Sequence, residues 1–177
     1  HTKEITDRKM LMSVQANRLK YKFHFYETSL NEKDPKTGCK ESHLKVIKQS
    51  INRKLDKVMI IEDDCKFLKS PTHLPKFPDS WDILYLGGTV HRRLADYNKD
   101  WTQVHTWNLH SYIINLSNKS LVDDILLLQT NDSYKNLEID EYFLKYINTK
   151  YKCYMITPMI AIQYDGFSNI ERSKVEY

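Results

Sequence analysis

The sequence predicts an α/β layered domain with a mainly parallel central sheet. Short apolar runs of strand length alternate along the chain with longer segments whose apolar residues recur at helical spacing. Consecutive strands that are joined through helices usually lie parallel to one another. The chain has 177 residues, of which 41% are hydrophobic, so it can bury one core. Because no linker or internal repeat divides it, we expect a single domain over residues 1–177.

The first part of the chain is expected to form a helix, a strand and a loop. Thr6 and Asp7 can cap a helix that carries apolar residues on one face. Residues 22–26 alternate enough to predict a short strand, and residues 31–38 are polar and contain proline and glycine, as loops do. The expected apolar face of the first helix consists of Met10, Leu11 and Val14.

The middle of the chain contains a helix and the two most apolar strands. Ser42 is expected to start a helix that runs to Leu55. The four apolar residues 58–61 predict a buried strand, and residues 83–86 predict a second, ended by Gly87 and Gly88. Three prolines place the intervening residues 69–80 in a loop.

The second half of the chain begins with a polar, aromatic stretch without clear periodicity. Residues 91–107 therefore predict a long loop. Further strands are expected over residues 112–116 and 151–156, and helices over 120–128 and 138–147. The chain after Pro158 is expected to be irregular.

Three consecutive acids, Glu62, Asp63 and Asp64, directly follow the strand expected at residues 58–61. Like charges so close together cost free energy unless a cation lies among them. Open α/β sheets bind ligands at the carboxyl ends of their strands, and Mg²⁺ and Mn²⁺ prefer carboxylate oxygens. The triplet therefore indicates a divalent cation site; the alternative is a solvated acidic turn.

Composition argues against several other classes of protein. The 27 basic and 23 acidic residues are interspersed and give a net charge of +4, without the basic block typical of nucleic-acid-binding proteins. No apolar run is long enough for a membrane span and no signal peptide is recognisable, which favours a cytoplasmic protein. The three cysteines lack a CxxC or Cys/His ligand spacing, so neither a zinc site nor a disulfide framework is expected.

Several short motifs occur together in a fixed order, and as a set they resemble glycosyltransferase family 25. That family includes lipooligosaccharide galactosyltransferases and procollagen hydroxylysine galactosyltransferases. Each motif alone is weak, but the ordered set covers nearly the whole chain. The motifs are Gly38–His43 (GCKESH), Glu62–Asp64, Trp81–Gly87 (WDILYLG), Ser111–Ile114, Ile139–Glu141 and Gln163–Ile170 (QYDGFSNI).

The resemblance implies a GT-A-type, Rossmann-like fold and a UDP-sugar donor, with Mn²⁺ as the metal and Mg²⁺ as the alternative. It implies transfer of galactose or glucose to a hydroxyl of a glycan or a collagen-like hydroxylysine. Asp64 would be the direct metal ligand, and Glu62 would approach the ribose or a metal-bound water. Asp63 would contact the donor, and Asp165 would complete the metal or donor site; Asp165 before a glycine is equally compatible with a turn.

An inverting transfer also needs a base that accepts the proton of the acceptor hydroxyl. Asp140 is the first candidate for this base and Glu141 the second. Neighbouring helical residues face about 100° apart, so one of the two is expected to point into the cleft. The alternative for Asp140 is an acid on the helix surface.

The remaining candidates would contact the donor. His43, near the expected helix start, could donate to the diphosphate or could simply be a packed histidine. Gly87 and Gly88 would let the substrate approach the backbone or would form a tight turn. Gln163 would complete the donor site.

One feature departs from the family pattern. Its members open with an apolar strand before the motif that Asp7 and Arg8 match, whereas only polar residues and Ile5 precede Asp7 here. We therefore expect a fold that lacks this first strand, with an altered nucleotide pocket. Two other functions stay open: a non-catalytic glycan- or protein-binding module on the same fold, and a metal-dependent phosphodiesterase.

Overall fold

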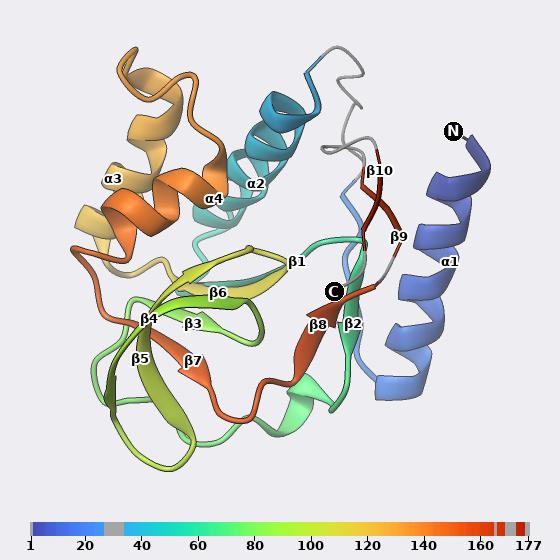
Figure 1. Cartoon of the computed structure of the whole chain (residues 1–177), viewed down its shortest axis with the longest axis horizontal. Coiled ribbons are helices and arrows are strands. Elements are labelled where there is room, and N and C mark those ends of the chain that lie inside the picture. The colour runs from blue at the N-terminus through green and yellow to red at the C-terminus, as the bar shows by residue number, and fades with distance from the viewer. Residues whose placement is uncertain (1, 27–33, 165, 169–172, 176–177) are drawn as a thin grey trace.

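The centre of the molecule is a six-stranded sheet with helices packed on one face (Figure 1). A computed structural model describes residues 2–26, 34–164, 166–168 and 173–175. The strand order is β1-β6-β3-β7-β5-β4, so β1 and β4 form the edges. These strands are β1 (Lys57–Ile61), β3 (Ile83–Tyr85), β4 (Thr89–Asp96), β5 (Trp101–Trp107), β6 (Ser111–Asn115) and β7 (Cys153–Ile156).

The α/β class is confirmed, but the sheet is mixed, and the prediction of a mainly parallel sheet is wrong. Within it, β3 and β7 pair in parallel, and the other neighbouring strands pair antiparallel. The reason is that β4 and β5 form a hairpin where a long loop was expected, and β6 then inserts between β1 and β3. As a result β1, β3 and β7 run in one direction, and their carboxyl ends lie at one edge of the sheet.

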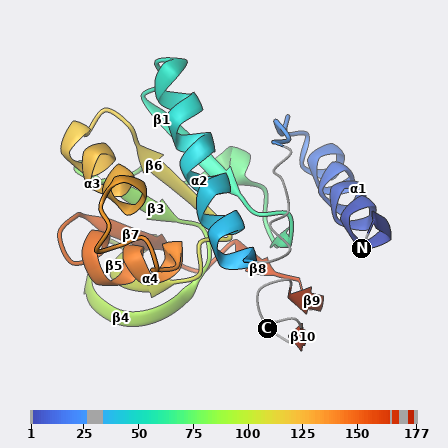
Figure 2. The same cartoon turned by 90° about the horizontal axis from the view of Figure 1, so that it is seen from above.

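Three of the described helices cover one face of the sheet (Figures 1 and 2). They are α2 (Pro35–Asn52), α3 (Lys119–Thr130) and α4 (Ile139–Tyr142), and α4 continues as the π-turn Phe143–Ile147. The pleat of β3 explains the two-sided core, because Ile83 and Tyr85 pack towards these helices and Leu84 packs on the opposite face. Among the described residues, no helix is both long and apolar enough to cross a bilayer.

The opposite face is covered by a second, smaller group of elements. Strands β2 (Cys65–Phe67) and β8 (Ala161–Gln163) pair antiparallel, so the chain just after the acid triplet lies beside the late Gln163 motif. The 3-10 turn η1 (Pro71–His73) lies in the predicted loop. Strands β9 (Gly166–Ser168) and β10 (Ser173–Val175) pair antiparallel in the segment that was expected to be irregular.

The helix predicted from Ser42 exists but begins at Pro35, so the loop predicted over residues 31–38 is wrong for its described part. Asp34 caps this helix by accepting a hydrogen bond from the Thr37 N–H at 3.1 Å, and Pro35 occupies the first helical position. His43 therefore lies well inside α2, and the expectation that it stands near a helix N-terminus is wrong. Ser42 is an interior residue that donates to the Gly38 carbonyl at 2.7 Å.

The long loop predicted over residues 91–107 is also wrong, because these residues form most of the β4–β5 hairpin. Strand β4 is exposed along its whole length, so it lacks the alternation of apolar and polar residues by which a half-buried strand is recognised. The short strand predicted over residues 22–26 is wrong, because these residues form neither a helix nor a strand.

Helix α1 (Thr2–Leu19) lies against β2 through polar contacts. The buried Gln15 donates to the Cys65 carbonyl and accepts from the Phe67 N–H, both at 2.8 Å. The Gln15 amide thus makes the hydrogen bonds to the backbone of β2 that a neighbouring strand would otherwise make. The expected apolar face is exposed instead, with Met10, Leu11 and Val14 at 65%, 43% and 55%.

We expect Gln15→Ala to lower the free energy of unfolding by about 2–3 kcal/mol, because it leaves a buried N–H and a buried carbonyl of β2 without partners. Urea denaturation measures this loss. Ser13→Ala on the same helix is the matched control, since the Ser13 hydroxyl bonds the Lys9 carbonyl at an exposed position and no other group among the described residues. Equal stabilities of the two variants would contradict the proposed role of Gln15.

Candidate functional site

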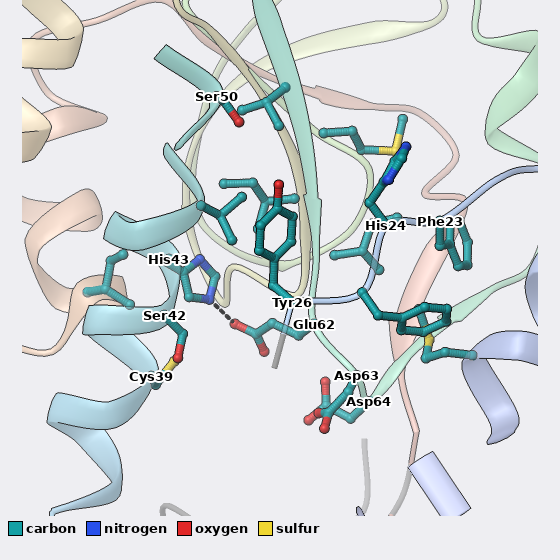
Figure 3. Close-up of a pocket in the computed structure, with 18 of the residues that line it drawn as sticks. Phe23, His24, Tyr26, Cys39, Ser42, His43, Ser50, Glu62, Asp63 and Asp64 are labelled. Carbon is teal, nitrogen blue, oxygen red and sulfur yellow. Dashed lines mark hydrogen bonds and ion pairs between the residues drawn. The ribbon is translucent and has the colours of Figure 1, made fainter. Parts of the chain in front are cut away.

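A cavity of about 710 Å³ extends along β1, with α2 on one side and residues 21–26 on the other (Figure 3). The acid triplet lies at the carboxyl end of β1 and lines this cavity. Asp140 at the start of α4 lines it as well. Carboxylates from two distant segments therefore line one partly open cavity.

The three acids differ in their exposure. The side chains of Glu62 and Asp64 are only 23% and 22% exposed, whereas that of Asp63 is 58% exposed. Arg8 of α1 donates to Asp63 Oδ1 at 2.7 Å, and its Nη1 lies 3.8 Å from Asp64 Oδ2. The protein thus supplies part of the positive charge that the triplet requires.

Asp64 is the least well compensated of the three acids. Its Oδ1 atom is buried and has no hydrogen-bond partner among the described residues. Burial and the negative charge of Glu62 raise the pKa of Asp64 to about 7, despite the opposing effect of Arg8. A cation bound at Oδ1 would give this oxygen a partner and would offset the cost of ionising Asp64. Within the triplet, this atom is therefore where a metal would fit best.

Glu62 forms an ion pair with His43 across the cavity wall (Figure 3). His43 Nε2 lies 3.0 Å from Glu62 Oε1, and His43 Nδ1 lies 2.7 Å from the Tyr112 hydroxyl. Burial alone would lower the pKa of His43, but Tyr112, Cys39 and Glu62 outweigh it and raise this pKa above its ordinary value. Burial likewise opposes the charge on Glu62, yet the hydrogen bond and charge of His43 lower its pKa. These opposite shifts favour a carboxylate paired with an imidazolium.

Asp140 and Glu141 have different surroundings. Burial and the charge of Glu62 raise the pKa of Asp140 to about 7, while His43 and the backbone N–H of Asn108 oppose this effect. Glu141 does not line the cavity and pairs with Lys145 at 2.5 Å. Of the two candidate bases, Asp140 is the one that the fold brings to the acids.

Neither Gly87 nor Gly88 lines the cavity, so the structure does not bring them to the predicted donor site. A Cβ atom on Gly87 would lie 1.9 Å from the Ala161 carbonyl oxygen, and Gly88 has a φ of +155°. Both glycines are needed because the protein's own chain passes close to them. Gln163 does line the cavity, where its Oε1 accepts from Asn108 Nδ2 at 3.2 Å. Asp165 lies outside the described residues.

Cys39 and Asn108 also line the cavity, and the sequence analysis did not identify them as site residues. Cys39 precedes His43 by four residues, a spacing that places both on one face of a helix, but the helix was expected to begin after Cys39. Asn108 has a φ of +70° and directly follows the hairpin that the sequence did not predict. No local signal in the sequence identifies it.

No protein-family model matches this chain, and no curated protein is significantly similar to it, so the function is inferred from the geometry of the site and the motifs above.

We expect Asp64→Asn to stabilise the protein at pH 8 by about 1–3 kcal/mol, because it removes a carboxylate whose ionisation disfavours the folded state. The folded-state pKa of about 7 lies above the ordinary value of 3.8, so the contribution of Asp64 to stability falls as pH rises from about 4 to 7. The gain should therefore disappear at pH 4. Urea denaturation at the two pH values without divalent cations measures it.

Asp63→Asn is the matched control for this prediction. It removes the neighbouring, mostly exposed carboxylate and its ion pair with Arg8, so it should bring no stabilisation at either pH. An Asp64→Asn variant that is as stable as Asp63→Asn at pH 8 would show that Asp64 is not under electrostatic strain.

Proposed function

We propose that this chain is a metal-dependent glycosyltransferase domain that transfers galactose or glucose from a UDP-sugar to a hydroxyl group of a glycan or a collagen-like hydroxylysine. The observation that carries this proposal is the convergence of Glu62, Asp64 and Asp140 on one cavity of about 710 Å³. This volume falls in the range of small-molecule sites and is sufficient for a nucleotide sugar. The ordered motifs that resemble glycosyltransferase family 25 support the same reaction.

The donor set of the triplet fits a hard divalent cation. Asp64 offers a buried carboxylate oxygen without a partner among the described residues, and Glu62 lies two residues away with its second oxygen outside the His43 hydrogen bond. Oxygen donors of this kind favour Mn²⁺ or Mg²⁺. When bound there, the ion supplies positive charge to the diphosphate that leaves with the nucleoside.

The other residues of the cavity wall would hold the donor. Gln163 and Asn108 already bond each other and present amide groups to the cavity. Trp107 also lines it and offers an aromatic face on which a sugar ring can stack. His43 fixes the orientation of Glu62, so its role would be to position that carboxylate rather than to contact diphosphate.

Asp140 would act as the base of an inverting displacement. The acceptor hydroxyl forms the new bond to the anomeric carbon, the bond from that carbon to the diphosphate breaks, and the hydroxyl proton passes to Asp140. A pKa of about 7 suits this role, because a base titrating near the working pH is both largely deprotonated and a good proton acceptor.

We expect Asp64→Ala to abolish binding of UDP-galactose and UDP-glucose in the presence of Mn²⁺. Isothermal titration calorimetry and the thermal shift caused by each donor measure this binding, because a ligand raises apparent stability by mass action. Wild-type protein should also hydrolyse the donor slowly. A folded wild-type chain that binds no UDP-sugar with Mn²⁺ present would contradict the proposal.

We expect Asp140→Asn to lower transfer by at least about 100-fold, because the loss of a general base costs about 10²–10⁴ in rate. Donor binding should be retained, since the substitution does not alter the acid triplet. Glu141→Gln is the matched control, because Glu141 pairs with Lys145 away from the cavity, and it should keep most of its activity. Equal losses in both variants would exclude Asp140 as the base.

A non-catalytic binding module on the same fold is the second candidate, and the ion pair between Arg8 and Asp63 favours it. Because this contact neutralises part of the triplet, the acids need less compensation from a metal. Binding of a glycan or collagen-like peptide without donor binding or turnover would select this alternative.

A further inference from the structure

A second group of metal-ligating atoms lies on the wall of the cavity. Cys39 Sγ, a ring nitrogen of His43 and a carboxylate oxygen of Glu62 all lie within 4.8 Å of one another. Cys39 and His43 are one turn apart on α2, and Glu62 comes from the end of β1 (Figure 3). Two rigid elements therefore present a sulfur, a nitrogen and an oxygen donor to one point.

The hydrogen bonds of His43 orient it as a metal ligand. Its Nδ1 is occupied by the Tyr112 hydroxyl at 2.7 Å, which leaves Nε2 directed at Glu62. Histidine ligands usually have their second ring nitrogen bonded to a fixed partner, which sets the tautomer and the orientation of the ring. The His43 and Tyr112 rings also stack with an interplanar angle of 7°, so the imidazole has little freedom to rotate.

We propose that Cys39, His43 and Glu62 form a site for a thiophilic divalent transition ion of the zinc class, distinct from the Mn²⁺ position at Asp64. Sulfur, imidazole and carboxylate donors together favour Zn²⁺ or Co²⁺ over Mg²⁺ and Mn²⁺. On binding, the Cys39 thiol and Nε2 of the His43 imidazolium each lose a proton to solvent as the metal–sulfur and metal–nitrogen bonds form. The three ligands line the cavity, so a water or substrate atom from the cavity can serve as the fourth ligand of a tetrahedral site.

The spacing of the donors is compatible with this geometry. Ligands at the usual zinc distances of about 2.0–2.3 Å lie about 3.3–3.8 Å apart in a tetrahedron. Donor atoms that are already within 4.8 Å need only small side-chain movements to reach that separation. The ion would replace the imidazolium as the positive partner of Glu62, so the site conserves the local charge balance.

Co²⁺ titration of the full chain tests this site, because a cobalt–thiolate bond produces a charge-transfer absorption band that oxygen and nitrogen ligands do not. We expect this band to saturate at one Co²⁺ per chain and to be displaced by Zn²⁺. Cys39→Ser should abolish it, whereas Cys153→Ala, which removes a thiol buried in the core, should retain it. Tyr112→Phe should weaken binding by about 10- to 100-fold, as expected for a lost outer hydrogen-bond partner.

Protection of the thiol gives a second measurement that needs no variant. Zn²⁺ should slow alkylation of Cys39 by iodoacetamide in the wild-type chain, as followed by mass spectrometry, with the buried Cys65 and Cys153 as internal references. Absence of the charge-transfer band, its persistence in Cys39→Ser, or unprotected Cys39 at saturating Zn²⁺ would each overturn the site. Asp64→Asn should keep the cobalt band even where it loses UDP-sugar binding, so failure of this site and failure of the proposed transferase are distinguishable.

Discussion

The crowding of carboxylates at the end of β1 is the constraint on which the site depends. Glu62, Asp64 and Asp140 are partly enclosed, and the negative charge of Glu62 raises the cost of ionising both Asp64 and Asp140. His43 neutralises Glu62, and Arg8 neutralises Asp63, but Asp64 and Asp140 keep pKa values of about 7. The protein therefore keeps two carboxyl groups with raised pKa values in one cavity, and perturbed pKa values of this kind are characteristic of binding and catalytic sites.

Several features of the fold serve to hold these charges in place. Gln15 attaches α1 to β2 and so fixes the helix that carries Arg8. The early start of α2 at Pro35 places Cys39 and His43 inside a regular helix that packs beside β1. The turn after β5 directs the Asn108 N–H at Asp140. Elements that are far apart in the sequence thus each contribute one group to the same cavity.

The sequence predicts the parts of this structure that have a strong local signal. The apolar runs of β1 and β3 and the helix α3 are found where they were expected. The partner Arg8 lies 55 residues from Asp63, so no local pattern could identify it. Strand direction and the β4–β5 hairpin depend on long-range pairing, and β4 lacks the alternation that marks a half-buried strand. The close approach of Ala161 to Gly87 is likewise a tertiary contact. From the Gly-Gly pair alone, a glycine needed for such a contact cannot be distinguished from a glycine needed for substrate binding.

The central claim is that the acid triplet holds a divalent cation together with a nucleoside diphosphate. Electron paramagnetic resonance of Mn²⁺ tests it most directly, because the six-line signal of the free aqueous ion decreases when the ion is bound by protein. We predict that the protein depletes this signal, more strongly with UDP present, and that substitution of Asp64 restores it. A free-ion signal that is the same with and without the folded protein, at saturating UDP, would contradict the account.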